Sequence, residues 1–117
     1  MKISKELLSE VLGYEALPTQ VSTKELQYID KRRKHGAFHP CRINIYELSH
    51  RCKEWASTKG YILFSKTRLS SSLASCYFDV MGFHDYEDDF KNDFRADTEV
   101  EAIIKACTYI LNTLSNK

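Results

Sequence analysis

The side chains that could do chemistry are densest between residues 31 and 42, where the sequence reads KRRKHGAFHPCR. A cluster of cations can neutralise the phosphates of a nucleic acid, and neighbouring aromatic rings can stack on bases. The sequence therefore predicts a nucleic-acid surface, against the alternative that the cations only solvate a loop. The predicted contact residues are Lys31, Arg32, Arg33, Lys34 and Arg42, with stacking from His35, Phe38 and Tyr46.

Histidine and cysteine in the same region raise two other possibilities, a zinc site and a thiolate nucleophile. Zinc ligands normally come in tight, matching pairs, whereas His35, His39 and Cys41 have no second pair to match. His50 and Cys52 follow two residues apart on the predicted helix, so they face different ways. Cys41 beside His39 lacks an orienting third group, and no GxSxG, P-loop or GxGxxG motif occurs. We therefore expect no metal, no cofactor, no small-molecule ligand and no enzymatic activity.

A second cluster, from residue 83 to residue 94, combines acidic and aromatic side chains. Phe83, Tyr86, Phe90 and Phe94 recur at spacings of three, four and four residues, which would align them on one face of a short helix. The carboxylates do not form an EF-hand loop, because no glycine follows Gly82. We predict that Tyr86, Phe90 and Phe94 dock on a protein partner; the alternative is burial in the chain's own core.

The net charge of +1 hides a strong polarity along the chain. Residues 31–68 carry ten basic and two acidic side chains, a net charge of +8, and residues 69–94 carry one lysine and six acids, a net charge of −5. Opposite blocks of this size allow self-association, in which the basic block of one copy meets the acidic block of another. The pI near 7.7 is lower than a dedicated nucleic-acid-binding domain usually has.

The clearest element that must position these side chains is a helix in the stretch from Ile43 to Gly60. Asn44 is a suitable N-cap, and Glu47 lies three residues later, as a capping box requires. Gly60 suits the left-handed stop. The apolar positions recur at helical spacing, namely Ile45, Leu48, Cys52, Trp55 and Ala56.

The remaining patterns predict a first helix between Ser4 and Gly13 and a C-terminal helix capped by Thr98 with Glu101. Strands are predicted at 23–30, 61–68 and 73–81, and residues 15–20 are predicted as a loop because of their proline. The order α-β-α-β-β-(α)-α indicates one α+β domain over residues 1–117. Its simplest architecture is two layers, with a three-stranded mainly antiparallel sheet and two long helices on one face.

Length and composition indicate where in the cell the protein resides, but not its activity. A chain of 117 residues should bury about 65% of the surface that it exposes when unfolded, so it needs no disulfide bonds to form a core. No apolar run approaches the roughly 20 residues of a membrane span, and MKISKELLSE is too polar for a secretory signal. We therefore expect a cytoplasmic protein with no membrane partner. Its four cysteines, 11, 24 and 31 residues apart, are expected to be small buried side chains, with a disulfide as the alternative.

Two stretches, NIYELSHRCKEWASTKGY at 44–61 and EAIIKACTYIL at 101–111, resemble small phage and prophage proteins of bacteria. The likeness covers about a quarter of the chain. No activity or catalytic residue is assigned to those proteins, so the resemblance implies a small accessory or host-interaction protein. We predict a non-enzymatic protein that binds a protein partner or a second copy, with nucleic-acid binding through the basic region 31–68 as the alternative.

Overall fold

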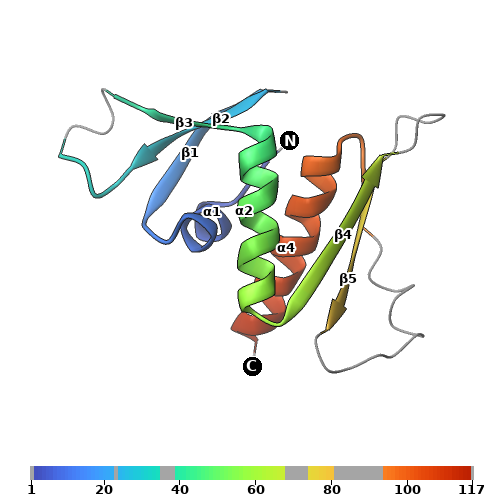
Figure 1. The fold of residues 1–117 in the computed structure, drawn as a ribbon. Helices are drawn as coiled ribbons and strands as arrows, with labels where there is room; N and C mark the ends of the chain where they lie inside the picture. Colours follow the sequence, from blue (N-terminus) through green and yellow to red (C-terminus); the bar gives the residue numbers. More distant parts are fainter. Residues whose placement is uncertain (1, 23, 35–38, 68–73, 81–93, 117) are drawn as a thin grey trace. The chain divides into compact units, whose positions relative to one another are not determined.

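The computed structural model describes residues 2–22, 24–34, 39–67, 74–80 and 94–116 (Figure 1). Its elements follow in the order α1, β1, β2, β3, α2, β4, β5, β6 and α4. The chain divides into two compact units, Met1–Arg51 and Cys52–Lys117, and the boundary falls inside helix α2 (Ile45–Thr58). The α+β class, with helices packed on antiparallel sheets, is confirmed, and the strands are distributed over two sheets rather than one.

Helix α1 (Lys5–Leu12) begins and ends where its sequence predicts. The Ser4 hydroxyl accepts a hydrogen bond of 3.1 Å from the backbone N–H of Leu7, which satisfies one free donor of the first turn. Gly13 follows the helix with a φ of 83°, a left-handed conformation that glycine adopts without a steric penalty. α1 packs against strand β1, and the Ser9 hydroxyl joins the two by bonding both backbone groups of Ala16.

The first unit contains an antiparallel sheet in the order β1-β2-β3, formed by β1 (Ala16–Val21), β2 (Glu25–Asp30) and β3 (Cys41–Asn44). β2 confirms the strand predicted at 23–30, and its buried face carries Leu26, Tyr28 and Asp30. The prediction of a loop at 15–20 is wrong, because this segment forms β1. Pro18 is tolerated there because β1 lies at the sheet edge and the pairing register shifts between Pro18 and Gln20.

Helix α2 confirms the central helix of the sequence. The Asn44 side chain accepts a hydrogen bond of 2.8 Å from the backbone N–H of Glu47, so the predicted cap is present. Gly60 ends the helical region with a φ of 91°, as its position predicts. The predicted apolar face is buried, and it comprises Ile45, Leu48, Cys52, Trp55 and Ala56.

The second unit contains a second antiparallel sheet in the order β4-β5-β6, formed by β4 (Tyr61–Thr67), β5 (Ala74–Val80) and β6 (Phe94–Ala96). β4 and β5 confirm the strands predicted at 61–68 and 73–81, and they pair from Tyr61 with Val80 to Thr67 with Ala74. β3 and β6 were not anticipated, since strands of four and three residues are too short to produce a period-two pattern.

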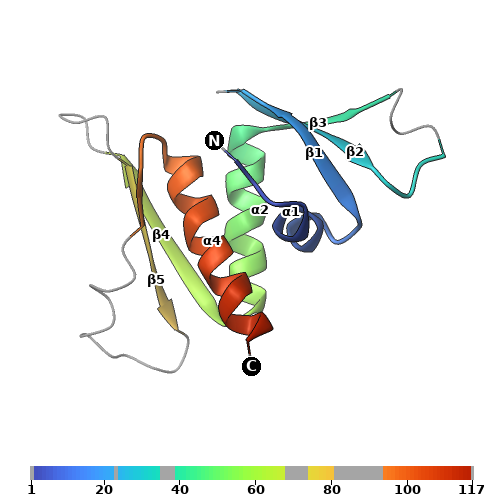
Figure 2. The same cartoon turned by 180° about the vertical axis from the view of Figure 1, so that it is seen from behind.

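Helix α4 (Glu99–Ser115) packs on all three strands of the second sheet (Figure 2). The Thr98 hydroxyl accepts the backbone N–H of Glu101 at 3.3 Å, which confirms the predicted N-cap. The broad apolar stripe of α4 therefore packs on this sheet. The side chains buried along this helix are Val100, Ala102, Ile103, Ile104, Ala106, Cys107 and Ile110. Within the described ranges, no helix is long and apolar enough to cross a membrane.

All four cysteines are free. Cys52, Cys76 and Cys107 are fully buried, as predicted, whereas Cys41 is partly exposed. The Cys107 thiol donates to the Cys52 carbonyl oxygen at 3.7 Å. A hydrogen bond with Cys52, and then burial, raise the pKa of the Cys107 thiol far above its ordinary value. This thiol is therefore a protonated core side chain at neutral pH.

Candidate nucleic-acid interface

The basic residues predicted to contact nucleic acid begin directly after strand β2. Backbone hydrogen bonds turn the chain there, because the N–H of Lys31 donates to the carbonyl of Glu15 at 3.0 Å and that of Arg33 to the carbonyl of Asp30 at 3.1 Å. The Asp30 carboxylate also accepts the backbone N–H of Arg32 at 3.0 Å, as in an Asx turn. Residues 31–34, called the basic turn below, therefore have a defined conformation although all four are exposed.

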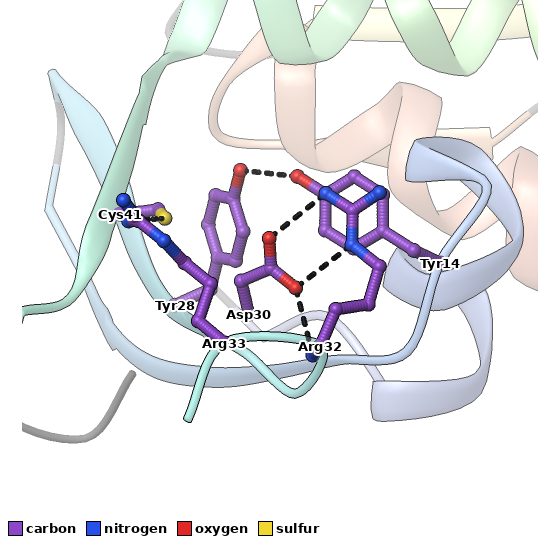
Figure 3. A network of polar contacts seen from close by, with 6 residues as sticks. All are labelled: Tyr14, Tyr28, Asp30, Arg32, Arg33 and Cys41. Carbon is purple, nitrogen blue, oxygen red and sulfur yellow. Dashed lines mark hydrogen bonds and ion pairs between the residues drawn. The ribbon is translucent and has the colours of Figure 1, made fainter. Parts of the chain in front are cut away.

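The Arg32 guanidinium is fixed from two directions (Figure 3). Its Nε and Nη2 atoms donate to the two carboxylate oxygens of Asp30 at 3.1 and 2.9 Å, the bidentate geometry that suits a planar guanidinium. The carbon at the centre of the guanidinium lies 3.6 Å from the centroid of the Tyr14 ring. The Arg32 side chain thus combines an ion pair with a cation–π contact.

This ion pair joins a buried anion to an exposed cation. The Asp30 side chain is only 7% exposed, whereas that of Arg32 is 62% exposed. The hydrogen bonds from Arg32 hold the pKa of the Asp30 carboxyl below its ordinary value, and the same interaction raises the pKa of Arg32. Asp30 is therefore ionised throughout the neutral range, and it compensates the charge of Arg32.

Tyr14, whose ring contacts Arg32, is held in turn by Tyr28. The hydroxyl oxygens of Tyr14 and Tyr28 lie 2.7 Å apart, and their ring centroids are separated by 6.4 Å. Burial, and then the hydrogen bond with Tyr14, raise the pKa of Tyr28 well above its ordinary value. The Tyr28 phenol therefore stays protonated, and its hydrogen bond with Tyr14 fixes the orientation of the Tyr14 ring.

The other three cations of the basic turn are exposed as well, without an Asp30 contact of their own among the hydrogen bonds of their side chains. Arg33 extends toward strand β3, where its Nη1 atom lies 3.6 Å from the Cys41 sulfur (Figure 3). Lys31 and Lys34 are exposed at the two ends of the turn. The structure thus brings four of the five predicted basic residues together in one turn, but it gives them different surroundings.

Arg42, the fifth predicted residue, is not part of the basic turn. It lies on β3 opposite Gln27, on the face of the sheet away from Tyr28 and Cys41. Its guanidinium is 3.7 Å from the Glu25 carboxylate, and both side chains are largely exposed. Such a surface ion pair contributes little to stability, so Arg42 is available for a ligand on the outer face of the sheet.

The structure describes only some of the remaining candidates. His35 and Phe38 lie outside the described residues, His39 is exposed, and Tyr46 is 87% exposed in the first turn of α2. Of the residues predicted to dock a protein, Tyr86 and Phe90 lie outside the described ranges. Phe94 begins β6, and its ring centroid lies 5.6 Å from that of Tyr109. In the part of the chain that the structure places, no three His, Cys, Asp or Glu residues could hold a metal ion.

Three residues of this site, Tyr14, Tyr28 and Asp30, were missed by sequence reasoning. An aspartate at the end of a strand, two residues before an arginine, is a recognisable Asx-turn pattern and could have identified Asp30. The contact of Tyr14 with Arg32 depends on the pairing of β1 with β2, in which Ala16 lies opposite Asp30. No local sequence pattern indicates that contact.

No family model, curated protein or solved structure matches the chain.

Proposed function

We propose that the protein is a small, non-enzymatic accessory protein of the phage type, and that its basic turn binds nucleic acid. One observation carries this proposal, the exposure of Lys31, Arg33 and Lys34 around a single hydrogen-bonded turn. Arg32 has its charge compensated by Asp30 and holds the turn in place. Because the turn is already ordered, binding loses less conformational entropy than binding by a disordered loop would.

The predicted role of the acidic, aromatic segment in docking a protein has less support. Phe94 packs against Tyr109 within the second unit, which is the alternative that competes with docking. By contrast, three exposed cations can each neutralise a phosphate. The logarithm of the binding constant should then fall with the logarithm of salt concentration, with a slope of about −2 to −3. Three phosphate contacts therefore give a modest affinity that falls as salt is added.

The test is a fluorescence-polarisation titration with labelled single-stranded and duplex DNA at low and physiological salt. The informative variant combines Lys31→Ala, Arg33→Ala and Lys34→Ala, and leaves Arg32 in place so that the turn keeps its ion pair. We expect this variant to lose at least tenfold in affinity at low salt and most of the salt dependence, because its phosphate contacts are gone.

The matched control removes three exposed lysines elsewhere, by Lys2→Ala, Lys24→Ala and Lys59→Ala. It changes the net charge by the same amount, so any effect of overall charge alone appears equally in both triple variants. The control should bind within threefold of the natural protein. Equal weakening of both variants, or no binding by the natural protein at low salt, would overturn the proposal.

A second candidate function, self-association, is favoured by strand β4. β4 pairs with β5 on one side and lies at the edge of its sheet among the described strands. Ile62 and Phe64 point away from the core and are 40% and 41% exposed. The strand has no proline and one charge, Lys66, although edge strands usually carry features that block pairing. We propose that β4 of a second copy of the chain pairs with this strand edge.

Identical strands pair antiparallel about a two-fold axis. Pairing centred on Phe64 would set Ile62 opposite Lys66 of the other copy and keep the two lysines apart. Sedimentation equilibrium over a wide range of protein concentration tests this. We expect a dimer that Ile62→Lys with Phe64→Lys converts to a monomer, while Tyr46→Lys leaves it unchanged. A monomer at every concentration, or a dimer that survives the double substitution, would contradict the candidate.

A further inference from the structure

The guanidinium of Arg32 is a planar group whose orientation is set before any ligand arrives. The Tyr14 ring covers one of its faces at 3.6 Å, and Asp30 holds one edge through two hydrogen bonds (Figure 3). The backbone N–H of Arg32 bonds the same carboxylate at 3.0 Å, so the side chain and the turn that carries it are fixed together. Few rotamers remain for this arginine to lose on binding.

Neither Tyr14 nor Asp30 contacts the second face of the guanidinium. The Arg32 side chain is 62% exposed, although Tyr14 covers one face and Asp30 occupies one edge. Part of this side chain is therefore accessible to a ligand. A guanidinium is weakly hydrated across its plane, and Asp30 has already compensated its charge. The second face is thus suited to a flat π system more than to a point charge.

We propose that this face is a stacking platform for one unpaired nucleobase, so that the basic turn is specific for single-stranded nucleic acid. This inference rests on the proposed function and names its substrate class. Nucleobases stack on arginine planes and aromatic rings, but the faces of a base inside a duplex are covered by its neighbours. Only a single strand, a loop or an end can offer a free base.

The neighbouring cations are placed to bind the phosphates on either side of the stacked base. Lys31 and Arg33 flank Arg32 in the chain, and Lys34 follows, all exposed on the same turn. A base stacked on Arg32 therefore carries its adjacent phosphates toward these three cations. Tyr14 stabilises the platform from beneath, and Tyr28 fixes the Tyr14 ring through the hydroxyl pair at 2.7 Å. In this arrangement Arg32 contacts the base, whereas Tyr14 and Asp30 are positioning residues.

The experiment compares two labelled probes of equal charge, an oligothymidylate of about 12 nucleotides and an abasic strand of the same length. Both probes carry the same phosphates, but only one carries bases. We expect the natural protein to bind the oligothymidylate about tenfold more tightly, because stacking of one base adds roughly that factor. Arg32→Lys keeps the positive charge and removes the plane, so it should bind both probes equally.

Arg51→Lys makes the same change at an arginine of α2, outside the basic turn, and serves as the control, with the preference for oligothymidylate retained. A second readout does not depend on the variants folding well. A 2-aminopurine base placed in the single strand should lose fluorescence when the natural protein binds, because stacking quenches it.

The outcomes separate the two proposals. Salt-dependent binding of both probes with equal affinity, and no quenching, would overturn the stacking platform while phosphate binding by the turn stands. Arg32→Lys with an undiminished preference for oligothymidylate would also overturn the platform. Failure of both probes to bind at low salt would remove the proposed function and, with it, the platform.

Discussion

Four adjacent cations with similar sequence signals have different roles in this structure. Arg32 is held by Asp30 and Tyr14, whereas Lys31 and Lys34 extend into solvent and Arg33 reaches the Cys41 sulfur. The difference arises because Asp30 ends the buried face of β2, and a buried carboxylate needs a partner that can satisfy both of its oxygens. A block substitution of all four cations would therefore mix a ligand effect with a folding effect.

Asp30→Asn should destabilise the protein and flatten its response to acid. The folded-state pKa of Asp30 lies below the ordinary value of 3.8, so its ion pair contributes stability that is complete above that value. This contribution is lost as the pH falls through the folded-state pKa. Urea unfolding measured at several values between about pH 6 and pH 3 should show a steeper loss in the natural protein than in Asp30→Asn.

Asp97→Asn, at an exposed position, is the control for this measurement and should follow the natural protein. If Asp30→Asn and the natural protein lose stability in parallel on acidification, the ion pair with Arg32 does not contribute in solution.

The thiols should differ sharply in reactivity toward a disulfide reagent such as Ellman's reagent. Cys41 is partly exposed, while Cys52, Cys76 and Cys107 are buried. The raised pKa of Cys107 further reduces its thiolate fraction at neutral pH. One thiol per chain should react rapidly in buffer and all four in denaturant. Cys41→Ser should abolish the rapid phase; a second fast thiol would show that the core opens readily.

At the scale of the elements, local signals at the helix ends correspond to hydrogen bonds in the structure. Ser4, Asn44 and Thr98 each accept a backbone N–H three residues later. Asn44→Ala should therefore lower the free energy of unfolding by about 1 kcal/mol, measured by urea titration, since it removes the side-chain acceptor of the Glu47 N–H.

Asn112→Ala makes the same chemical change at an exposed position inside α4, where the side chain caps nothing. Alanine has the higher helix propensity, so this control should be neutral or slightly stabilising. If Asn112→Ala costs as much stability as Asn44→Ala, the cap at the start of α2 contributes nothing specific.

At the scale of the whole molecule, one helix belongs to both compact units. Residues 45–51 of α2 lie in the first unit and residues 52–58 in the second. Because helix formation is cooperative along the chain, we expect both units to unfold in one transition, in keeping with the prediction of a single domain. Trp55, the chain's only tryptophan, is buried in the second unit and reports on it by fluorescence.

Leu26→Ala tests this coupling, because Leu26 is fully buried in the first unit. Removing its side chain should cost about 2–5 kcal/mol, and the unfolding midpoint followed by Trp55 fluorescence should fall accordingly. Gln27→Ala, on the other face of the same strand, should leave the midpoint nearly unchanged. A midpoint that does not move in Leu26→Ala would mean that the two units unfold independently.

The sequence by itself determined helices α1, α2 and α4, their caps, and strands β2, β4 and β5, because these depend on contacts within a few residues and on the period of the apolar positions. It also located the cations of the basic turn. The tertiary structure alone decided that Pro18 sits in an edge strand and that Phe94 packs on Tyr109. It likewise placed Tyr14 beneath Arg32. These outcomes depend on pairings between distant segments, whose register and burial no local pattern encodes.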